Sequence, residues 1–400
     1  MINVISKINH PERIGKLQDD LKQAGIVAAL IQKPRNVYYY AGTGQPCNLW
    51  VPASGEAILF TRRVHAMAEE AAWVDRVVPA SSFKQMLQTL AKEGLSPLPG
   101  DTVAAELDSV PYKIMKSLQK DLGGVELANV TDLAMKHRLV KSPDEIERIR
   151  EAGKLWKLGH EAILRSAKAG MTEYEVAAVM EHACRGGGGD GVIWFHRWDG
   201  CLPGGGIIAS GPNAWIVSGH AMTVTGTGMD RSLPWGASER VLQQGELVVA
   251  DYGVAKKSYH FDTARTYCVG EASAEQKKLW KQLTDLHFSV IERVREGVTG
   301  AELYQAALDA ATKMGLDPYF MGVGGERGAY IGHTIGLEID EWPVLGPKAS
   351  EPLPANAVIT LEPKFMIPGV GGVMVEDSIL VKPDGYELLG AIGHDLFEIG

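Results

Sequence analysis

The chain has 400 residues, 22% of them charged, and a formal net charge of −9 at pH 7. This length exceeds what one hydrophobic core usually organises, so we expect two domains, each large enough to fold without disulfide bonds. The acidic balance argues against nucleic acid or an anionic membrane surface as partner and favours a small molecule or a short peptide.

The N-terminal stretch MINVISKINHPERIGK lacks a charged region followed by an apolar one, as a secretory signal would have. No apolar run approaches the roughly 20 residues of a membrane span. The four cysteines form no CxxC pair, which fits reduced thiols. We therefore expect a cytoplasmic protein without a membrane partner.

Helical and strand patterns alternate in the first part of the chain. A helix is predicted near residues 11–24. Strands are predicted at 26–31, 37–40, 57–60 and 102–106. This alternation predicts a layered α/β domain, which we expect to span residues 1–138.

A capping box marks the start of a second domain near Leu139. Ser142 has the place of a helix N-cap, Pro143 is the first helical residue and Glu145 is the third. The same signature recurs at Thr172, Ser273 and Thr299. Strand-like segments lie between these starts, at 206–210, 247–252, 263–269, 358–365 and 372–381. Helices beside short strands indicate an α+β domain, expected to span residues 139–400.

Two acids flank a predicted hairpin. Asp251 ends the apolar strand ELVVAD, and Asp262 follows eleven residues later in HFDTART. An odd separation of this size lets the two side chains converge from neighbouring strands onto one face. Acids so placed repel each other unless a cation lies between them, and burying either one unpaired costs several kcal/mol.

Two more acids lie inside apolar, β-rich segments, where buried side chains are expected. They are Glu362, in VITLEPKF, and Glu376, in GVMVEDSILV, while His333 lies between glycines in GHTIG. One such acid is commonly a salt-bridged residue. Four acids and one imidazole together suit manganese, iron, cobalt or zinc, and a shared carboxylate can bridge two ions roughly 3.5–4 Å apart.

With these residues the chain resembles the creatinase, prolidase and methionine aminopeptidase metallohydrolases. Their motifs are Asp, Asp eleven residues later, His in GHxxG, Glu in TxEP and Glu in GxxxED. The matching residues here are Asp251, Asp262, His333, Glu362 and Glu376. The segments KSPDEI and ASGPN, and the first 138 residues, are also similar to the family.

The resemblance implies an α+β fold: a C-terminal pita-bread catalytic domain preceded by an α/β creatinase-type N-terminal domain. It implies that Asp251 and Glu376 bridge two divalent ions, that Asp262 binds one ion, and that His333 and Glu362 bind the other. Manganese is favoured, with iron, cobalt and zinc as alternatives. The N-terminal domain also implies a homodimer.

Two positions depart from the peptidase pattern. Peptidase members usually carry a second His seven residues after the first, where this chain has Asp340. This acid can serve as a general base or acid, or it can be a salt-bridged loop residue. The family also places a His in a short turn after the position of Asn213. The candidate here is His220, two residues out of register, and it can equally be a loop residue without function.

The resemblance implies a hydrolase that cleaves Xaa-Pro dipeptides or N-terminal Xaa-Pro bonds, with a metal-bridging hydroxide attacking the scissile carbonyl. Glu362 would relay a proton and His220 would stabilise the oxyanion, with Asp340 as a third candidate catalytic residue. The alternative is a relative acting on a small metabolite, either a dimethylsulfoniopropionate-type lyase or a C–N hydrolase of the creatinase or ectoine-hydrolase type. Asp340 favours this alternative. The complete ligand set argues against creatinase chemistry and against a non-catalytic binding module.

Overall fold

The structure is a computed structural model of the chain, and it describes residues 10–196, 206–216, 224–324, 326–390 and 392–400. The contacts between Cα atoms divide the chain into two compact units, residues 1–138 and residues 139–400.

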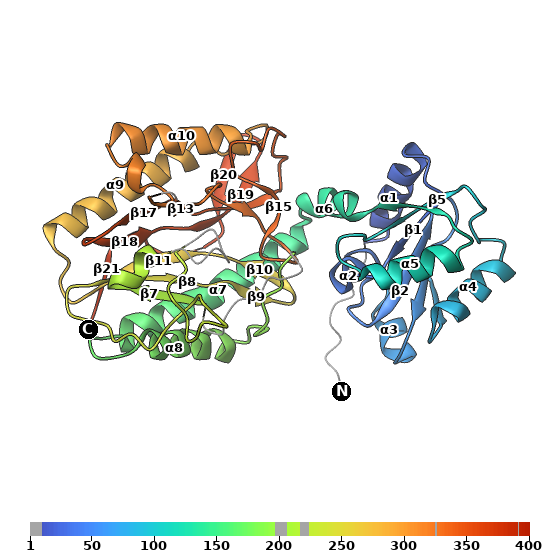
Figure 1. Cartoon of the computed structure of the whole chain (residues 1–400), viewed down its shortest axis with the longest axis horizontal. Helices are drawn as coiled ribbons and strands as arrows, with labels where there is room; N and C mark the ends of the chain where they lie inside the picture. The colour runs from blue at the N-terminus through green and yellow to red at the C-terminus, as the bar shows by residue number, and fades with distance from the viewer. Residues whose placement is uncertain (1–9, 197–205, 217–223, 325, 391) are drawn as a thin grey trace. The chain divides into compact units, whose positions relative to one another are not determined.

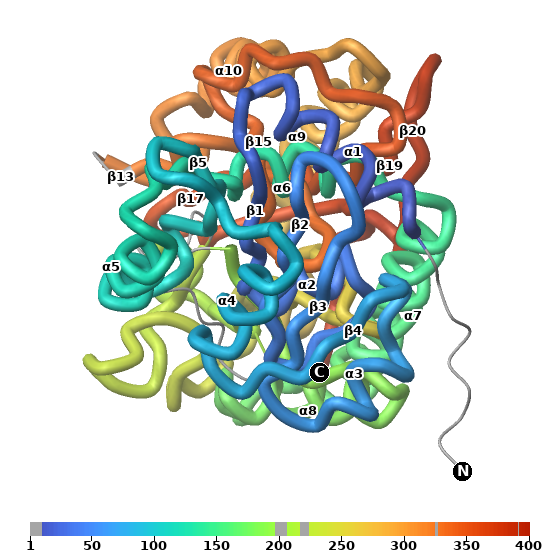
Figure 2. Tube along the Cα trace, turned by 90° about the vertical axis from the view of Figure 1, so that its right-hand side faces the viewer, coloured from blue at the N-terminus to red at the C-terminus, as the bar shows by residue number. Residues whose placement is uncertain are grey.

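The first unit is a six-stranded sheet covered by helices. Its strands are Ala28–Ile31 (β1), Cys47–Pro52 (β2), Ile58–Thr61 (β3), Arg76–Pro79 (β4), Thr102–Ala105 (β5) and Glu126–Asn129 (β6). Its helices are Glu12–Gln23 (α1), Pro34–Ala41 (α2), His65–Ala71 (α3), Phe83–Lys92 (α4), Tyr112–Asp121 (α5) and Thr131–Leu139 (α6). The strand order is β4-β3-β2-β1-β5-β6, and Figure 2 shows β5, β1, β2, β3 and β4 in succession.

Helices cover both faces of this sheet. Side chains of α4 and α5 share a core with Leu30, Trp50 and Phe60 of the sheet. Helices α1 and α2 contact β1 and β2 and cover the other face. Every residue of β1, β2 and β3 is therefore buried, as in other sheets enclosed between helices.

The predicted strand at 37–40 is wrong, because these residues belong to helix α2. Pro34 has the favourable first position of that helix, and Gly42 closes it in the left-handed conformation at φ 84°. The hydroxyl of Tyr39 donates to the carbonyl oxygen of His137 at 2.8 Å, so tertiary packing also supports the helix. A short apolar run does not distinguish a strand from a buried helix.

In the described residues, the second unit contains two larger sheets and three two-stranded β-ribbons between helices. Its helices are Pro143–Ser166 (α7), Glu173–Gly186 (α8), Ala274–Ile291 (α9) and Gly300–Lys313 (α10). Its first strands are Ile207–Ser210 (β7), Leu247–Asp251 (β8), Val254–Lys256 (β9), Tyr259–Phe261 (β10), Ala264–Val269 (β11), Gly322–Val323 (β12), Glu326–Arg327 (β13) and His333–Thr334 (β14). The later strands are Glu341–Val344 (β15), Val358–Leu361 (β16), Lys364–Ile367 (β17), Gly371–Met374 (β18), Asp377–Lys382 (β19), Gly385–Leu388 (β20) and Phe397–Ile399 (β21).

The two larger sheets have the strand orders β21-β11-β8-β7 and β15-β14-β16-β19-β20. Figure 1 shows the sheets between the pair α7–α8 and the pair α9–α10. Leu286 of α9 and Leu303 of α10 share one core with Ile359 and Ile379 of the five-stranded sheet. This burial holds the sheet against the helices.

The four capping boxes predicted from the sequence are confirmed. They begin α7, α8, α9 and α10 at Ser142, Thr172, Ser273 and Thr299. In each, the N-cap side chain and the acid or amide three residues later satisfy each other's backbone N–H groups. None of the helices in the described parts of the chain has the length and apolarity needed to cross a bilayer.

The strands predicted at 358–365 and 372–381 are each broken in two. The first divides at Glu362-Pro363 into β16 and β17, because proline cannot donate a backbone hydrogen bond to a sheet. The second divides at Val375-Glu376 into β18 and β19. At both breaks the chain passes between the five-stranded sheet and the ribbon β17–β18.

Gly372 of β18 lies directly against the 3₁₀ turn Gly211–Trp215. A Cβ atom at Gly372 would be 2.0 Å from the carbonyl oxygen of Ala214. We expect Gly372→Ala to lower the free energy of unfolding by about 1–3 kcal/mol, because one backbone segment must move. Gly385→Ala is the control, since a Cβ atom there meets nothing within 4 Å. Urea denaturation measures both, and equal losses in the two variants would contradict the close contact.

Candidate metal centre

The five predicted ligand residues lie at strand ends and strand breaks of the second unit. Asp251 is the last residue of β8, and Asp262 lies between β10 and β11. His333 begins β14, while Glu362 and Glu376 lie at the two breaks described above. The hairpin predicted between the two aspartates is confirmed as the ribbon β9–β10.

These side chains converge on a buried space. Ligand atoms of Asp262, His333 and Glu376 all lie within 4.8 Å of one another. His333 Nε2 is 3.9 Å from Asp262 Oδ2 and 3.8 Å from Glu362 Oε1. These separations are too long for hydrogen bonds. The separation from Glu362 matches the spacing of about 3–4 Å between two ligand atoms that each lie roughly 2 Å from the same ion.

Local contacts orient the imidazole of His333. Its Nδ1 atom lies 3.2 Å from the carbonyl oxygen of Thr334. An N–H group at Nδ1 donates to this oxygen and leaves the lone pair of Nε2 facing the carboxylates. Gly332 permits the close approach of β14 to β16, because a Cβ atom there would be 2.1 Å from the carbonyl oxygen of Thr360.

The centre carries surplus negative charge. Burial and the charges of Asp251 and Glu362 raise the pKa of Asp262 well above its usual value. Burial and the charge of Asp262 likewise raise the pKa of Glu376. Lys364 Nζ lies 2.8 Å from Glu362 Oε2, but one ammonium does not balance four carboxylates.

A carboxylate oxygen in this centre also lacks a protein partner. Asp262 Oδ1 is buried and accepts no hydrogen bond from any residue that the structure describes. A buried oxygen of this kind is costly unless a cation or a proton meets it. The oxygen-rich donor set with one imidazole therefore fits divalent metal ions.

Asp340 borders this centre. Its negative charge contributes to the raised pKa of Asp262. Burial raises the pKa of Asp340 itself, against the opposing effects of the His196 backbone N–H and of His333. The His196 N–H donates to Asp340 Oδ1 at 2.6 Å. Asp340, the residue that departs from the peptidase pattern, thus lies next to the predicted metal ligands.

Two residues that the sequence analysis missed, Trp194 and His196, lie on the segment bound to Asp340. The carbonyl oxygen of Trp194 accepts from the Ile339 N–H at 2.8 Å. His196 Nδ1 lies 3.4 Å from Glu338 Oε2. These contacts join residues more than a hundred positions apart, so no local sequence pattern could indicate them.

One buried carboxylate, that of Glu173, binds Ser210 and Ser238, the two ends of the segment that contains His220. Glu173, the first residue of α8, accepts from the N–H and the hydroxyl of Ser210 at 2.6 and 2.7 Å. It also accepts from the N–H and the hydroxyl of Ser238 at 3.1 and 2.6 Å, and from the Asn213 amide at 3.1 Å. His220 itself lies outside the described residues, so its candidate role stays a prediction.

Comparison with known proteins shows the family of both units. The model for metallopeptidase family M24 matches residues 147–383, and the model for the creatinase/prolidase N-terminal domain matches residues 13–140. The chain is 28% identical over 380 residues to the Xaa-Pro dipeptidase of Pyrococcus horikoshii, covering 94% of this chain and 96% of that protein.

Solved structures show the same likeness across both units. The prolidase from Pyrococcus horikoshii superposes with a TM-score of 0.79 at 26% identity, covering 96% of this chain and 99% of that one. The Xaa-Pro dipeptidase from Bacillus anthracis superposes with a TM-score of 0.82 at 25% identity, covering 97% and 99%.

These matches confirm the expected fold class, an α/β creatinase-type N-terminal domain followed by a pita-bread catalytic domain. A metallopeptidase family implies divalent metal ions, in agreement with the buried carboxylates and the imidazole. The chain is a metallohydrolase that belongs to the metallopeptidase family M24.

Proposed function

We propose that the protein is a dinuclear-metal hydrolase that cleaves Xaa-Pro dipeptides or N-terminal Xaa-Pro bonds. The observation that carries the proposal is the convergence of Asp262, His333, Glu362 and Glu376 in one buried, electronegative space. The curated Xaa-Pro dipeptidase and the solved prolidase reported above support the substrate class.

In this proposal Asp251, Asp262, His333, Glu362 and Glu376 hold two divalent ions, with manganese favoured over iron, cobalt and zinc. When bound, such ions polarise a carbonyl group and make hydroxide available near neutral pH. The protein contributes the buried donor atoms and their orientation, as the bond from His333 Nδ1 to Thr334 illustrates.

Glu362 also moves a proton in this proposal. Its Oε2 atom is bound by Lys364, while its Oε1 atom faces His333. In this role the Glu362 carboxylate accepts the proton of the attacking water and delivers it to the proline nitrogen as the C–N bond breaks. Lys364 keeps the carboxylate in one orientation during both transfers.

Asp340 and His220 complete the proposed catalytic set. Asp340 stands beside the centre, where a carboxylate can take up or release a proton. His220 belongs to the segment between Ser210 and Ser238, whose two ends bind Glu173. We propose that His220 stabilises the oxyanion.

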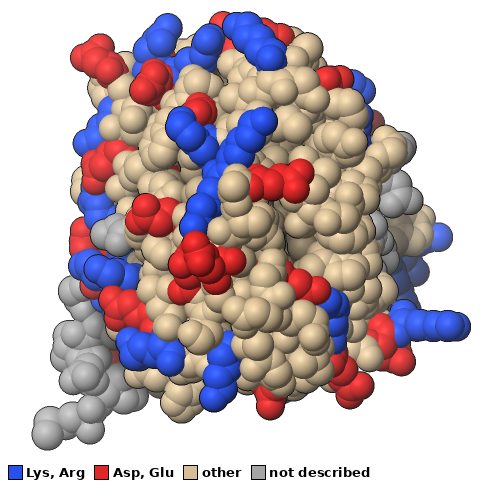
Figure 3. Space-filling view, turned by 90° about the vertical axis from the view of Figure 1, so that its left-hand side faces the viewer, with Lys and Arg blue, Asp and Glu red and all other residues tan. Residues whose placement is uncertain are grey.

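We also propose that the substrate is a short peptide and that the active protein is a cytoplasmic homodimer. On the face in Figure 3, Lys and Arg side chains are interspersed with Asp and Glu, so that face offers no basic field for nucleic acid. Buried free thiols at Cys47, Cys184 and Cys268 fit a reducing compartment.

A second candidate function follows from Asp340. Relatives that hydrolyse peptides usually have His at this position, and an ionised acid cannot donate a proton as an imidazolium does. The alternative substrate is a small non-peptide metabolite, cleaved by a dimethylsulfoniopropionate-type lyase or a C–N hydrolase.

The function is tested by turnover of purified, metal-reconstituted protein on Xaa-Pro dipeptides and longer Xaa-Pro peptides. We expect metal-dependent cleavage on the amino side of proline. Glu362→Gln should lower kcat by at least about 10²-fold, because the proton relay is lost, while much of the metal is retained. Glu387→Gln, on β20 of the five-stranded sheet, is the control and should keep full activity. Absence of cleavage at full metal occupancy would exclude the peptidase and leave the metabolite as the substrate.

Asp340 is tested by two substitutions of different chemistry. Asp340→Asn keeps an oxygen for the His196 N–H but cannot exchange a proton, whereas Asp340→Ala loses both functions. We expect kcat to fall by about 10²-fold in both variants, with unchanged metal content. Wild-type activity in Asp340→Asn would show that Asp340 only binds the 194–196 segment and takes no part in proton transfer.

Asp262→Asn tests the repulsion among the ligands. We expect it to raise the Tm of the metal-depleted protein by about 2–4 °C, the shift that roughly 1 kcal/mol produces in a large domain. The same variant should bind Mn²⁺ at least ten-fold more weakly. Thermal denaturation with and without EDTA measures the Tm of each form. Asp384→Asn, in an exposed turn, is the control. A lower Tm of metal-depleted Asp262→Asn would show that repulsion does not dominate.

A further inference from the structure

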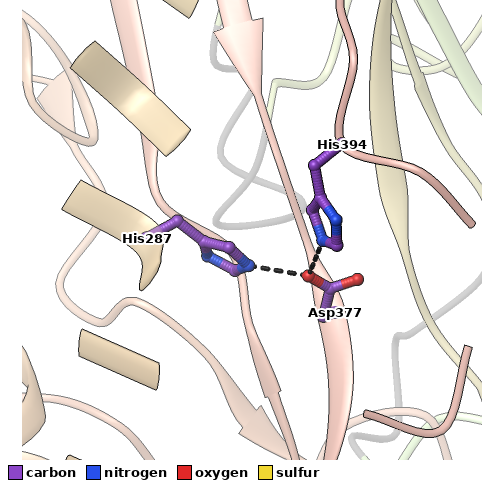
Figure 4. A group of neighbouring side chains, drawn as sticks. All are labelled: His287, Asp377 and His394. Atoms are coloured by element: carbon purple, nitrogen blue, oxygen red, sulfur yellow. Dashed lines mark hydrogen bonds and ion pairs between the residues drawn. The ribbon is translucent and has the colours of Figure 1, made fainter. Parts of the chain in front are cut away.

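A second cluster of ionisable side chains is buried beside Glu376. Asp377 Oδ2 lies 2.8 Å from His287 Nε2 and 2.6 Å from His394 Nε2. Arg265 donates to the other carboxylate oxygen at 2.7 Å. Figure 4 shows the two imidazoles reaching the carboxylate from different directions. These four residues, Arg265, His287, Asp377 and His394, are named the Asp377 network.

The network joins elements that are far apart in the sequence. Arg265 lies on β11, Asp377 begins β19, His287 lies on α9 and His394 precedes β21. The Nε atom of Arg265 donates to the carbonyl oxygen of Gly393 at 2.8 Å, which ties the C-terminal segment to β11. Strand β19 is thereby fixed from three sides.

The cluster resembles a metal site, but its contacts are those of hydrogen bonds and an ion pair. Ligand atoms of His287, Asp377 and His394 lie within 4.8 Å of one another. Both imidazole nitrogens are at hydrogen-bonding distance from the same oxygen, and a guanidinium nitrogen of Arg265 lies 3.3 Å from His394 Nε2. The guanidinium already supplies the positive charge and would repel a metal ion.

The network reaches the main chain of Glu376 through Arg265. The NH1 atom of Arg265 donates to the carbonyl oxygen of Glu376 at 2.6 Å, and the hydroxyl of Thr263 donates to the same oxygen. The N–H of Glu376 donates to the carbonyl oxygen of Ala264 at 3.1 Å. Both peptide groups flanking the Glu376 side chain are therefore fixed at the break between β18 and β19.

We propose that Asp377 is a positioning residue for the metal centre. It holds Arg265, and Arg265 holds the main chain of Glu376, so that the carboxylate faces Asp262 and His333 before any ion binds. This inference rests on the proposed function, because it assigns Glu376 as a metal ligand.

Asp377 has a second effect on the same centre. An Arg265 side chain released from Asp377 could turn toward the Glu376 carboxylate and neutralise it in place of a divalent ion. Asp377 opposes this by accepting a hydrogen bond from the guanidinium at 2.7 Å. Partners that orient metal ligands typically affect metal affinity by about 10–100-fold.

The test is Mn²⁺ binding to the metal-depleted full chain, measured by isothermal titration calorimetry. We expect Asp377→Asn to bind Mn²⁺ about 10–100-fold more weakly than wild type. The absorption spectrum of the Co²⁺-loaded variant should also change, because the orientation of Glu376 changes. His394→Gln, at a partly exposed position, should weaken binding in the same direction and serves if Asp377→Asn does not fold.

The matched control is His137→Gln. His137 Nε2 also bonds a carboxylate, Asp20 Oδ2, at 2.7 Å, but in the first unit. This variant loses a similar bond and should bind Mn²⁺ as wild type does. Wild-type affinity in Asp377→Asn and His394→Gln, or an equal loss in His137→Gln, would overturn the inference. A wild-type chain that binds no divalent ion would overturn the proposed function instead.

Discussion

The repulsion among the buried carboxylates of Asp262, Glu362 and Glu376 is the constraint on which the second unit depends. Like charges a few ångströms apart in a medium of low dielectric constant drive a site open or force its acids to take up protons. The fold must therefore keep the acids together until cations arrive. Lys364 offsets part of the charge, and hydrogen bonds between backbone segments resist the remainder.

Strand breaks allow two sheets to meet at this charged centre. The chain leaves the five-stranded sheet at Glu362 and returns to it after Glu376, and the ribbon β17–β18 lies between. An acid at such a break can turn toward the centre while its apolar neighbours stay in their sheets. The Asp377 network lies directly behind one of these breaks, where the backbone bends.

The sequence singles out the acids that converge in the structure because the signals for them are local. An acid inside an apolar strand, as at Glu376, is unusual in any fold, and a capping box such as the one at Thr299 marks a helix start by itself. The helix at 34–41 was missed because a short apolar run has no distinct period. His394 and His196 could not be predicted, since their partners are remote in sequence and only the folded chain brings them together.

The hydrogen bonds of Glu173 limit how far changes in the segment between Ser210 and Ser238 reach into the rest of the molecule. The Glu173 carboxylate fastens the chain at Ser210 and again at Ser238, so the residues in between start and finish at fixed points whatever their composition. Exposed positions of that stretch, such as 229–232, can change without moving β7 and β8, whereas Ala214, Val224 and Trp235 pack against these strands and must stay apolar. Changes at those exposed positions can then accumulate among descendants of one ancestral protein while the positions of the candidate metal ligands are inherited unchanged.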